Sequence, residues 1–220
     1  MRAVIFDLDG TLCDSAPDLH ASANVLLAGL GKDPLALDLV RSFIGNGVPK
    51  LVERVMRASD IAFDPERHAQ LTGQFERIYT ANPVSETVLY PGVRDVLDTL
   101  RAEGCPLGVC TNKVHHITMQ VLQGLGVDMY FGSVIGGDSL PTHKPDPAMM
   151  HACIKELGGG DVVYVGDSEV DSATAVAAGI PFVLFAKGYR KSPVEEIPHG
   201  AVFNDFSELP AILSDMTTLA

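Results

Sequence analysis

The sequence lacks tryptophan and contains only four cysteines, at positions 13, 105, 110 and 153, none of them in a C-x-x-C pair. Neither a cysteine zinc site nor a disulfide framework is therefore expected, and the thiols are predicted to stay reduced in the cytoplasm. No apolar run approaches the roughly 20 residues of a membrane helix. The opening segment reaches Asp7 too soon for a secretory signal, so we predict no membrane partner.

Positive charge is also scarce. The 220 residues include 16 lysines and arginines against 28 aspartates and glutamates, which gives a formal net charge of −12. Proteins that bind nucleic acid neutralise phosphates with lysine and arginine, so this balance argues against a nucleic-acid partner. A hydrophobic fraction of 46% is enough to build a sizeable core and excludes a disordered chain.

Short apolar runs alternate with segments of helical periodicity over much of the chain. Three runs end in polar clusters and a fourth follows an alanine-rich segment: Val4–Phe6, Leu107–Cys110, Val162–Val165 and Phe182–Phe185. The helical segments are expected at 93–103, 118–125 and 171–178. This alternation predicts an α/β fold with a doubly wound parallel sheet, in which ligands bind beyond the carboxyl ends of the strands.

A different pattern occupies the region after the first run, where helical stretches follow one another without a strand between them. The amphipathic stretches are His20–Leu30, Leu51–Ala58 and His68–Tyr79. We interpret residues 15–82 as an inserted helical domain, and residues 1–14 and 83–220 as the α/β core. The aromatic residues of the insertion, Phe63, Phe75 and Tyr79, are expected to pack in its interior.

The polar clusters bring carboxylates to the strand ends. Asp7 and Asp9 are two residues apart on an extended segment, so both side chains can reach one pocket. Two carboxylates this close repel unless a cation lies between them. Mg²⁺ would relieve that repulsion, and Asp167 at another strand end can complete its oxygen ligands.

A cation in this position attracts phosphate, and the other clusters offer groups that bind it. Thr111 and Asn112 supply a hydroxyl and an amide, while Lys144 supplies a compact positive charge. Each has a structural alternative, since Thr111 and Asn112 could cap the next helix and Lys144 could be a solvated loop residue. Lys113 is equally compatible with the pocket and the surface.

Four motifs, in order and in context, resemble those of the haloacid dehalogenase superfamily of phosphohydrolases. They are Asp7-Leu8-Asp9-Gly10-Thr11, Thr111-Asn112, Lys144-Pro145 and Gly166-Asp167-Ser168-Glu169-Val170-Asp171. The resemblance spans nearly the whole chain. It implies that the inserted helical domain is the small helical-bundle cap of that superfamily.

The resemblance also implies roles for these residues. Asp7 is expected to attack the phosphoryl group and form an aspartyl-phosphate, and Asp9 to act as general acid and then general base. Mg²⁺ is expected on Asp7, Asp167 and the backbone carbonyl of Asp9. Lys144 would offset charge on the transferring phosphoryl group. Asp171 would hold Lys144 or a metal-bound water, although it could be only a favourable charge at a helix start.

The cap contains one segment with the features of an anion site. Gly45, Asn46 and Gly47 precede a helix expected to begin near Pro49, and their backbone N–H groups could bind a substrate carboxylate, with Lys50 or Arg41 as charge partner. The same glycines could simply form a turn between helices. His115, His116 and His143 lie near the motifs without metal-ligand spacing, and we expect them at the surface or beside the site.

Within the superfamily the resemblance is closest to phosphoglycolate phosphatases, on Thr111-Asn112-Lys113, Gly136–Pro141 and Val165–Asp171. It implies hydrolysis of a small phosphorylated metabolite, 2-phosphoglycolate, by a monomer or homodimer. The alternatives are a phosphatase of broader specificity, a β-phosphoglucomutase-like phosphotransferase and, from another class, a receiver-like phospho-acceptor module. Asp9 argues against a true dehalogenase, which usually lacks this second acid.

Overall fold

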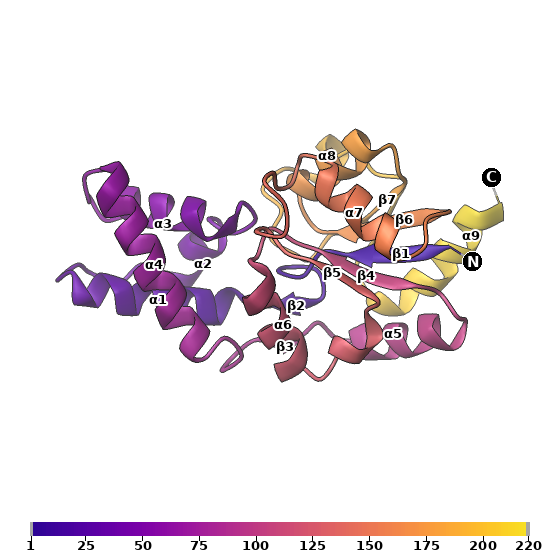
Figure 1. Ribbon diagram of the computed structural model, residues 1–220, viewed down its shortest axis with the longest axis horizontal. Coiled ribbons are helices and arrows are strands. Elements are labelled where there is room, and N and C mark those ends of the chain that lie inside the picture. Colours follow the sequence, from indigo (N-terminus) through magenta and orange to yellow (C-terminus); the bar gives the residue numbers. More distant parts are fainter. Residues whose placement is uncertain (1, 219–220) are drawn as a thin grey trace.

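A six-stranded parallel sheet forms the centre of the larger of two lobes in the computed structural model, which describes residues 2–218 (Figure 1). In spatial order the strands are β5 (Ser133–Ile135), β4 (Leu107–Cys110), β1 (Ala3–Phe6), β6 (Val162–Gly166), β7 (Phe182–Phe185) and β8 (Ala201–Phe203). Ile5 of β1 pairs with Gly108 on one side and Tyr164 on the other. The predicted parallel α/β sheet is confirmed.

Helices cover both faces of this sheet, as Figure 1 shows. One face carries α5 (Val93–Ala102), α6 (His115–Gly124) and α9 (Leu209–Thr218), and the other carries α7 (Ala148–Glu156) and α8 (Glu169–Ala178). Short 3₁₀ helices lie at Asp128–Tyr130, Val194–Glu196 and Phe206–Glu208. Alternate residues of β1 serve the two layers, because Val4 and Phe6 pack in one hydrophobic core and Ile5 in the other.

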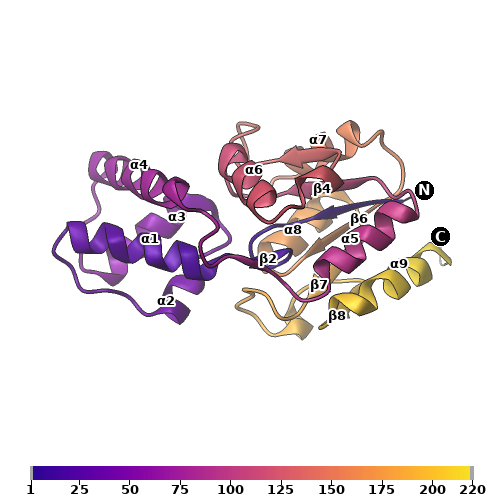
Figure 2. The ribbon, with the colours of Figure 1, turned by 90° about the horizontal axis from the view of Figure 1, so that it is seen from below.

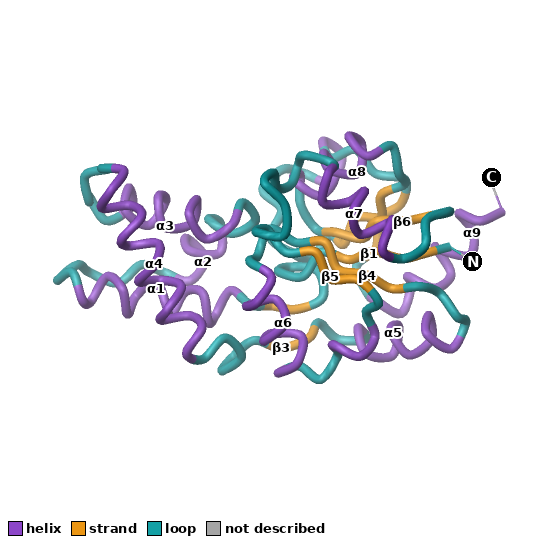
Figure 3. The backbone as a smooth tube through the Cα atoms, in the orientation of Figure 1, coloured by secondary structure: helices purple, strands orange, loops and turns teal. Residues whose placement is uncertain are grey.

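The second lobe is helical and lies beyond the carboxyl ends of the strands (Figures 1 and 2). It contains α1 (Ala16–Gly29), α2 (Leu37–Arg41), α3 (Gly47–Ala58) and α4 (Pro65–Ala81). Leu27, Val52 and Phe75 are fully buried in it. We call this lobe the cap, and Figure 3 shows that helices and loops alone build it.

The chain enters and leaves the cap through a short antiparallel ribbon. β2 (Cys13–Asp14) pairs with β3 (Val88–Leu89) at the junction of the two lobes. Beside the ribbon, the carboxylate of Asp18 accepts hydrogen bonds from the N–H groups of Glu86 and Thr87 at 2.9–3.1 Å and from the Thr87 hydroxyl at 2.6 Å. These bonds fasten the returning segment to the first turn of α1.

Several elements were not predicted, and one packing prediction is wrong. No clear signal in the sequence marks α2, α7, α9, the ribbon, β5 or β8, which are short or lack a clear apolar pattern. Phe63 is 61% exposed and its ring lies 5.4 Å from that of His68, whereas Phe75 and Tyr79 are buried as expected. Within residues 2–218, none of the helices has both the length and the apolar composition to cross a membrane.

Candidate active site

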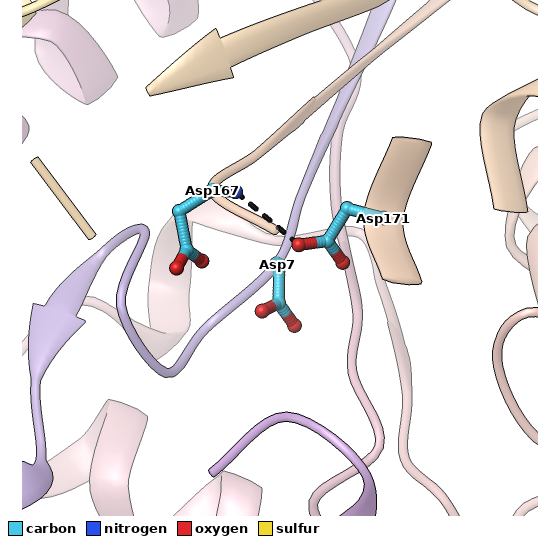
Figure 4. Close-up of side chains that lie close together, drawn as sticks. All are labelled: Asp7, Asp167 and Asp171. Carbon is cyan, nitrogen blue, oxygen red and sulfur yellow. Dashed lines mark hydrogen bonds between the residues drawn. The ribbon is translucent and has the colours of Figure 1, made fainter. Parts of the chain in front are cut away.

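Three buried aspartates meet where β1 and β6 end. Asp7 directly follows β1, Asp167 follows β6, and Asp171 lies in the first turn of α8. Their carboxylates lie close together (Figure 4), and one carboxylate oxygen from each lies within 4.8 Å of the others. Because parallel strands end at the same edge of the sheet, residues 160 positions apart in sequence form one cluster.

This cluster carries more negative charge than its neighbours neutralise. Burial raises the pKa of Asp7 to about 6 and that of Asp167 well above its usual value, and the nearby carboxylates add to both shifts. Among residues 2–218, Lys144 is the only lysine or arginine that forms an ion pair with this cluster, and it contacts Asp7 and Asp171 but not Asp167. A hard divalent cation with oxygen ligands fits this set of donors, and Asp7 and Asp167 are the residues best placed to hold it.

Lys144 lies at the centre of a saturated network. Its Nζ atom contacts Asp7 Oδ1 at 2.8 Å, Asp171 Oδ1 at 2.7 Å and the Tyr164 hydroxyl at 2.8 Å. Burial favours the neutral amine, but Asp171 and Asp7 outweigh it and raise the Lys144 pKa above its usual range. The ammonium therefore stays charged, and all three of its N–H groups have partners.

Asp171 is held by the helix that it begins. Its Oδ2 atom accepts hydrogen bonds from the N–H groups of Asp167 and Ser168 and from the Ser168 hydroxyl, while the Ser168 hydroxyl accepts from the Asp171 N–H group. This is a capping box. Burial opposes ionisation of Asp171, yet Lys144 and these bonds lower its pKa. Both expected roles, helix capping and contact with Lys144, coexist in this one side chain.

Asp9 faces a different set of partners. Its Oδ1 atom accepts a 2.5 Å hydrogen bond from Ser15 Oγ, and its Oδ2 atom forms a 2.9 Å ion pair with Lys113 Nζ. Lys113 also donates a 3.0 Å hydrogen bond to the hydroxyl of Tyr79 in α4. Lys113, whose position the sequence left open, is therefore a buried residue of the site, where core and cap meet.

Asn112 connects three segments of the site. Its amide Nδ2 donates to the backbone carbonyls of Gly45 and Lys144, both at 3.1 Å, and its Oδ1 atom accepts from the Lys144 N–H group at 2.9 Å. The side chain thus links the Lys144 loop to the cap loop. Thr111 is buried beside it, and its hydroxyl accepts a 3.3 Å hydrogen bond from the Lys113 N–H group.

A cavity lies between the core and the cap, and these residues line its core side. The cap side is formed by apolar side chains and by a glycine-containing loop. The complete lining is Asp7, Asp9, Leu19, Ile44, Gly45, Gly47, Val48, Leu51, Thr111, Asn112, Lys113 and Lys144. A smaller adjoining cavity is bordered by Asn46, Asp167 and Lys191, among other residues, and it also reaches Asp7 and Asp9.

The cap loop contributes part of what the sequence predicted. Gly45 and Gly47 have φ angles of 113° and 80°, which favour glycine, and both line the larger cavity. A Cβ atom on Gly47 would lie 3.3 Å from the Asn112 carbonyl oxygen. Lys50, however, forms an ion pair with Glu53 at 2.8 Å and lines neither cavity.

Arginines support this loop from outside. Arg54, in α3, donates hydrogen bonds to the Phe43 carbonyl at 2.6 Å and to Asn46 Oδ1 at 2.8 Å. Arg41 pairs instead with Asp38 at 3.0 Å and Asp14 at 3.5 Å, and it borders neither cavity. Arg54 from the cap and Asn112 from the core therefore hold this loop from opposite sides.

Tyrosines are the functional residues that sequence reasoning missed. The Tyr189 N–H group donates to Asp167 Oδ2 at 2.5 Å, while its hydroxyl accepts from the N–H groups of Ser15 and Ala16 and donates to Asp14. One side chain therefore joins the carboxylate cluster to the cap entrance. No local pattern marks Tyr189 or Tyr164, and helical spacing predicted Tyr79 only as an interior residue of the cap, because each meets its partner only through the fold.

Glycine and threonine in the first motif complete the surroundings of Asp167. Thr11 Oγ1 donates a 2.8 Å hydrogen bond to Asp167 Oδ1. A Cβ atom on Gly10 would lie 2.5 Å from Asp167 Oδ2, so only glycine allows this approach. The three histidines near the motifs, His115, His116 and His143, are exposed as expected.

Comparison with known proteins identifies the family. The haloacid dehalogenase-like hydrolase family matches residues 1–179. The chain belongs to this family. It is 49% identical to a phosphoglycolate phosphatase of Cereibacter sphaeroides over 97% of this chain and 98% of the relative, and 43% identical to one of Rhodobacter capsulatus over 98% of both.

A solved structure extends the similarity to three dimensions. The crystal structure of a predicted phosphoglycolate phosphatase from Haemophilus somnus superposes with a TM-score of 0.91 at 31% identity, covering 97% of this chain and 98% of that one. The predicted superfamily and the predicted class of enzyme, a phosphoric monoester hydrolase, are confirmed.

Proposed function

We propose that the protein hydrolyses 2-phosphoglycolate to glycolate and phosphate through an aspartyl-phosphate on Asp7, with Mg²⁺ as cofactor. The observation that carries the proposal is the cluster of Asp7, Asp167 and Asp171, in which Lys144 pairs with Asp7 and Asp171 and in which Asp7 and Lys144 line the cavity. The relatives that bear the name phosphoglycolate phosphatase support the choice of substrate.

Asp7 is the proposed nucleophile because it is the buried carboxylate that also lines the cavity and has an oxygen without a hydrogen-bond donor among residues 2–218. Lys144 holds its other oxygen at 2.8 Å and fixes the direction of attack. Mg²⁺, held by Asp7, Asp167 and the Asp9 carbonyl, would neutralise charge on the phosphoryl oxygens. Asp171 keeps Lys144 in place.

Asp9 is the proposed general acid and base. Its carboxylate lines the same cavity, but it faces Lys113 and Ser15 and lies outside the three-aspartate cluster. It can therefore donate a proton to the leaving oxygen of the ester and then accept one from the hydrolytic water. Thr111 and the backbone around Asn112 are proposed to contact the phosphoryl oxygens.

The cap is proposed to cover the substrate, with residues 15–82 as the moving unit and the β2–β3 ribbon as its connection to the core. Gly45, Asn46 and Gly47 are proposed to contact the leaving group from the cap side. Closure over the cavity would exclude water from the transferring phosphoryl group, which strengthens electrostatic interactions there.

Two measurements on the purified protein test this function. Phosphate release from 2-phosphoglycolate is expected with Mg²⁺ and is expected to disappear when a chelator removes the metal. A reaction quenched during turnover and reduced with borohydride is expected to convert residue 7 to homoserine, detectable by mass spectrometry, because borohydride reduces acyl phosphates. Turnover without any such modification, or without metal, would contradict the proposed mechanism.

A further inference from the structure

Two buried lysines line the cavity, and their ammonium groups differ in the number of polar partners. Lys144 Nζ has three partners at 2.7–2.8 Å. Lys113 Nζ has two, the Asp9 carboxylate at 2.9 Å and the Tyr79 hydroxyl at 3.0 Å. An ammonium has three N–H groups, so in the part of the chain that the structure describes only Lys113 keeps one for a ligand in this cavity.

The position of Lys113 relative to Asp9 defines what that ligand can be. In the proposed reaction the ester oxygen of the leaving group contacts the Asp9 carboxylate, and the Lys113 ammonium lies one ion-pair distance beyond it, at 2.9 Å. In 2-phosphoglycolate a single methylene separates the ester oxygen from the carboxylate. A carboxylate that close to the ester oxygen falls within reach of Lys113.

The remaining cavity wall gives a polar leaving group few other partners. Leu19, Ile44, Val48 and Leu51 form an apolar surface that offers no side-chain hydrogen bonds to sugar hydroxyls. A charge pair is strong where water is excluded, and the Lys113 side chain is only 3% exposed. Lys50 and Arg41, the two residues that the sequence suggested as partners of a substrate carboxylate, are paired with acidic residues outside the cavity.

We infer that Lys113 binds the carboxylate of the leaving group and so determines the specificity of the enzyme for small phosphorylated carboxylic acids. Tyr79 fixes the ammonium from the cap, with its ring centroid 4.7 Å from Nζ. Because Tyr79 belongs to the cap and Lys113 to the core, selection of the carboxylate requires the two lobes to be in contact. The inference rests on the proposed phosphatase function and deepens it.

The wild-type enzyme provides the first test. Ethyl phosphate matches 2-phosphoglycolate in chain length and lacks only the carboxylate, so the ratio of kcat/KM between the two substrates measures carboxylate recognition. We expect a preference of about hundredfold or more for 2-phosphoglycolate, the scale of a buried charge-assisted contact. Equal hydrolysis of both would overturn the role of Lys113 while leaving the phosphatase function intact; hydrolysis of neither would overturn the proposed function itself.

Substitution then assigns the preference to a residue. In Lys113→Met the ratio is expected to fall to within about tenfold of unity, since the partner of the carboxylate is lost. Lys155→Met removes the same charge from an exposed position on α7 and is the matched control. Loss of Lys113 also disturbs Asp9. That effect lowers kcat/KM for both substrates by the same factor and leaves their ratio unchanged.

The ratio therefore separates specificity from positioning. If Lys113→Met lowers kcat/KM for both substrates by the same factor, Lys113 only positions Asp9 and the inference is wrong. If Lys50→Met collapses the ratio instead, the carboxylate binds at the cap surface and the inference is also wrong. Should Lys113→Met fail to fold, Lys113→Arg keeps the charge and displaces it, and it must lower kcat/KM for 2-phosphoglycolate more than for ethyl phosphate.

Discussion

The two sides of the cavity are built on different principles. On the core side, Lys144 and the buried carboxylates Asp7 and Asp171 form a network in which nearly every polar atom has a partner. On the cap side, the lining consists mostly of apolar side chains such as Leu19 and Val48, which offer no hydrogen-bonding groups. The core side is thus lined by charged and hydrogen-bonding groups whose positions are fixed by their partners, while the cap side is mostly apolar.

Energetics explain why this division is stable. Buried charges destabilise a fold unless each has a partner, so the reactive aspartates can be concentrated only where strand ends and α8 supply lysine, hydroxyl and N–H groups. The cap packs in a hydrophobic core that is continuous with the core on one face of the sheet, and contacts such as Asn112 with Gly45 also join the two lobes. Its apolar cavity wall needs no charged partners of this kind.

The largest effect is expected from Asp7→Asn, which removes the nucleophile and keeps the shape of the side chain. We expect kcat to fall by about 10⁴-fold or more, as for other covalent nucleophiles. Circular dichroism and the midpoint of urea unfolding serve as controls for folding. Substantial residual turnover in a folded variant would show that the core side does not supply the nucleophile.

The contrast between the two lysines predicts different costs in stability. Lys144→Met leaves Asp7 and Asp171 buried without their counterion, and the free energy of unfolding is expected to fall by about 3 kcal/mol. Lys113→Met is expected to cost about 1 kcal/mol, because Asp9 keeps its bond to Ser15 and faces the cavity. Urea titrations measure both changes in the free energy of unfolding. Equal losses for the two variants would contradict the difference between the two lysines.

Proton competition at Asp7 predicts a pH dependence of metal binding. The pKa of this carboxyl in the metal-free fold is about 6, because burial raises it, and Mg²⁺ requires the ionised form. The Kd for Mg²⁺ is expected to rise by at least about tenfold per pH unit below pH 6, where Asp7 binds a proton that the metal must displace. Calorimetric titration from pH 5 to 8 measures this, and a pH-independent Kd would exclude Asp7 as a ligand.

The same shift has a consequence for the metal-free protein. A folded-state pKa above the unfolded value means that the native state binds the proton more tightly, so protonation of Asp7 stabilises the fold at low pH. This contribution is lost as the pH rises through about 6. Saturating Mg²⁺ is expected to restore the lost stability at pH 7, which thermal unfolding with and without the metal can measure.

The smallest of these effects is expected from Asn112→Ala, which removes the link between the Lys144 loop and the cap loop. We expect kcat/KM to fall about tenfold, with the free energy of unfolding lowered by about 1 kcal/mol. Steady-state kinetics and urea unfolding measure the two changes. If instead kcat collapsed as in Asp7→Asn, Asn112 would act in the chemistry and not in joining core to cap.

Much of this architecture was predictable from sequence because its signals are local. The bounds of β4 and β7 agree with the predicted runs, and the inserted helices follow from the absence of strand-like segments between residues 15 and 81. Asp7 and Asp167 were predicted to lie close together because parallel strands end at one edge of the sheet. In the structure they form a cluster with Asp171, and Lys144, from a loop, contacts Asp7 and Asp171.

Other features depend on contacts that no local pattern encodes. Asn112 was expected to face phosphate, but its amide bonds to backbone carbonyls from two distant loops. Lys50 follows the glycine-containing cap loop and was expected to pair with the substrate, but it forms an ion pair with Glu53 one turn away on α3. Lys113 could not be assigned until the fold brought Tyr79 of α4 beside it.

We propose that the core residues around Asp7 transfer the phosphoryl group to water, and that Lys113, held by Tyr79 of the cap, selects a small acidic leaving group. The most direct test measures kcat/KM and phosphate release for 2-phosphoglycolate beside β-glucose 1-phosphate, with saturating Mg²⁺. We predict release of one phosphate per 2-phosphoglycolate consumed and a preference for it of at least about a thousandfold, the scale of differential transition-state binding. A flat profile, or conversion of the sugar phosphate without phosphate release, would contradict the account.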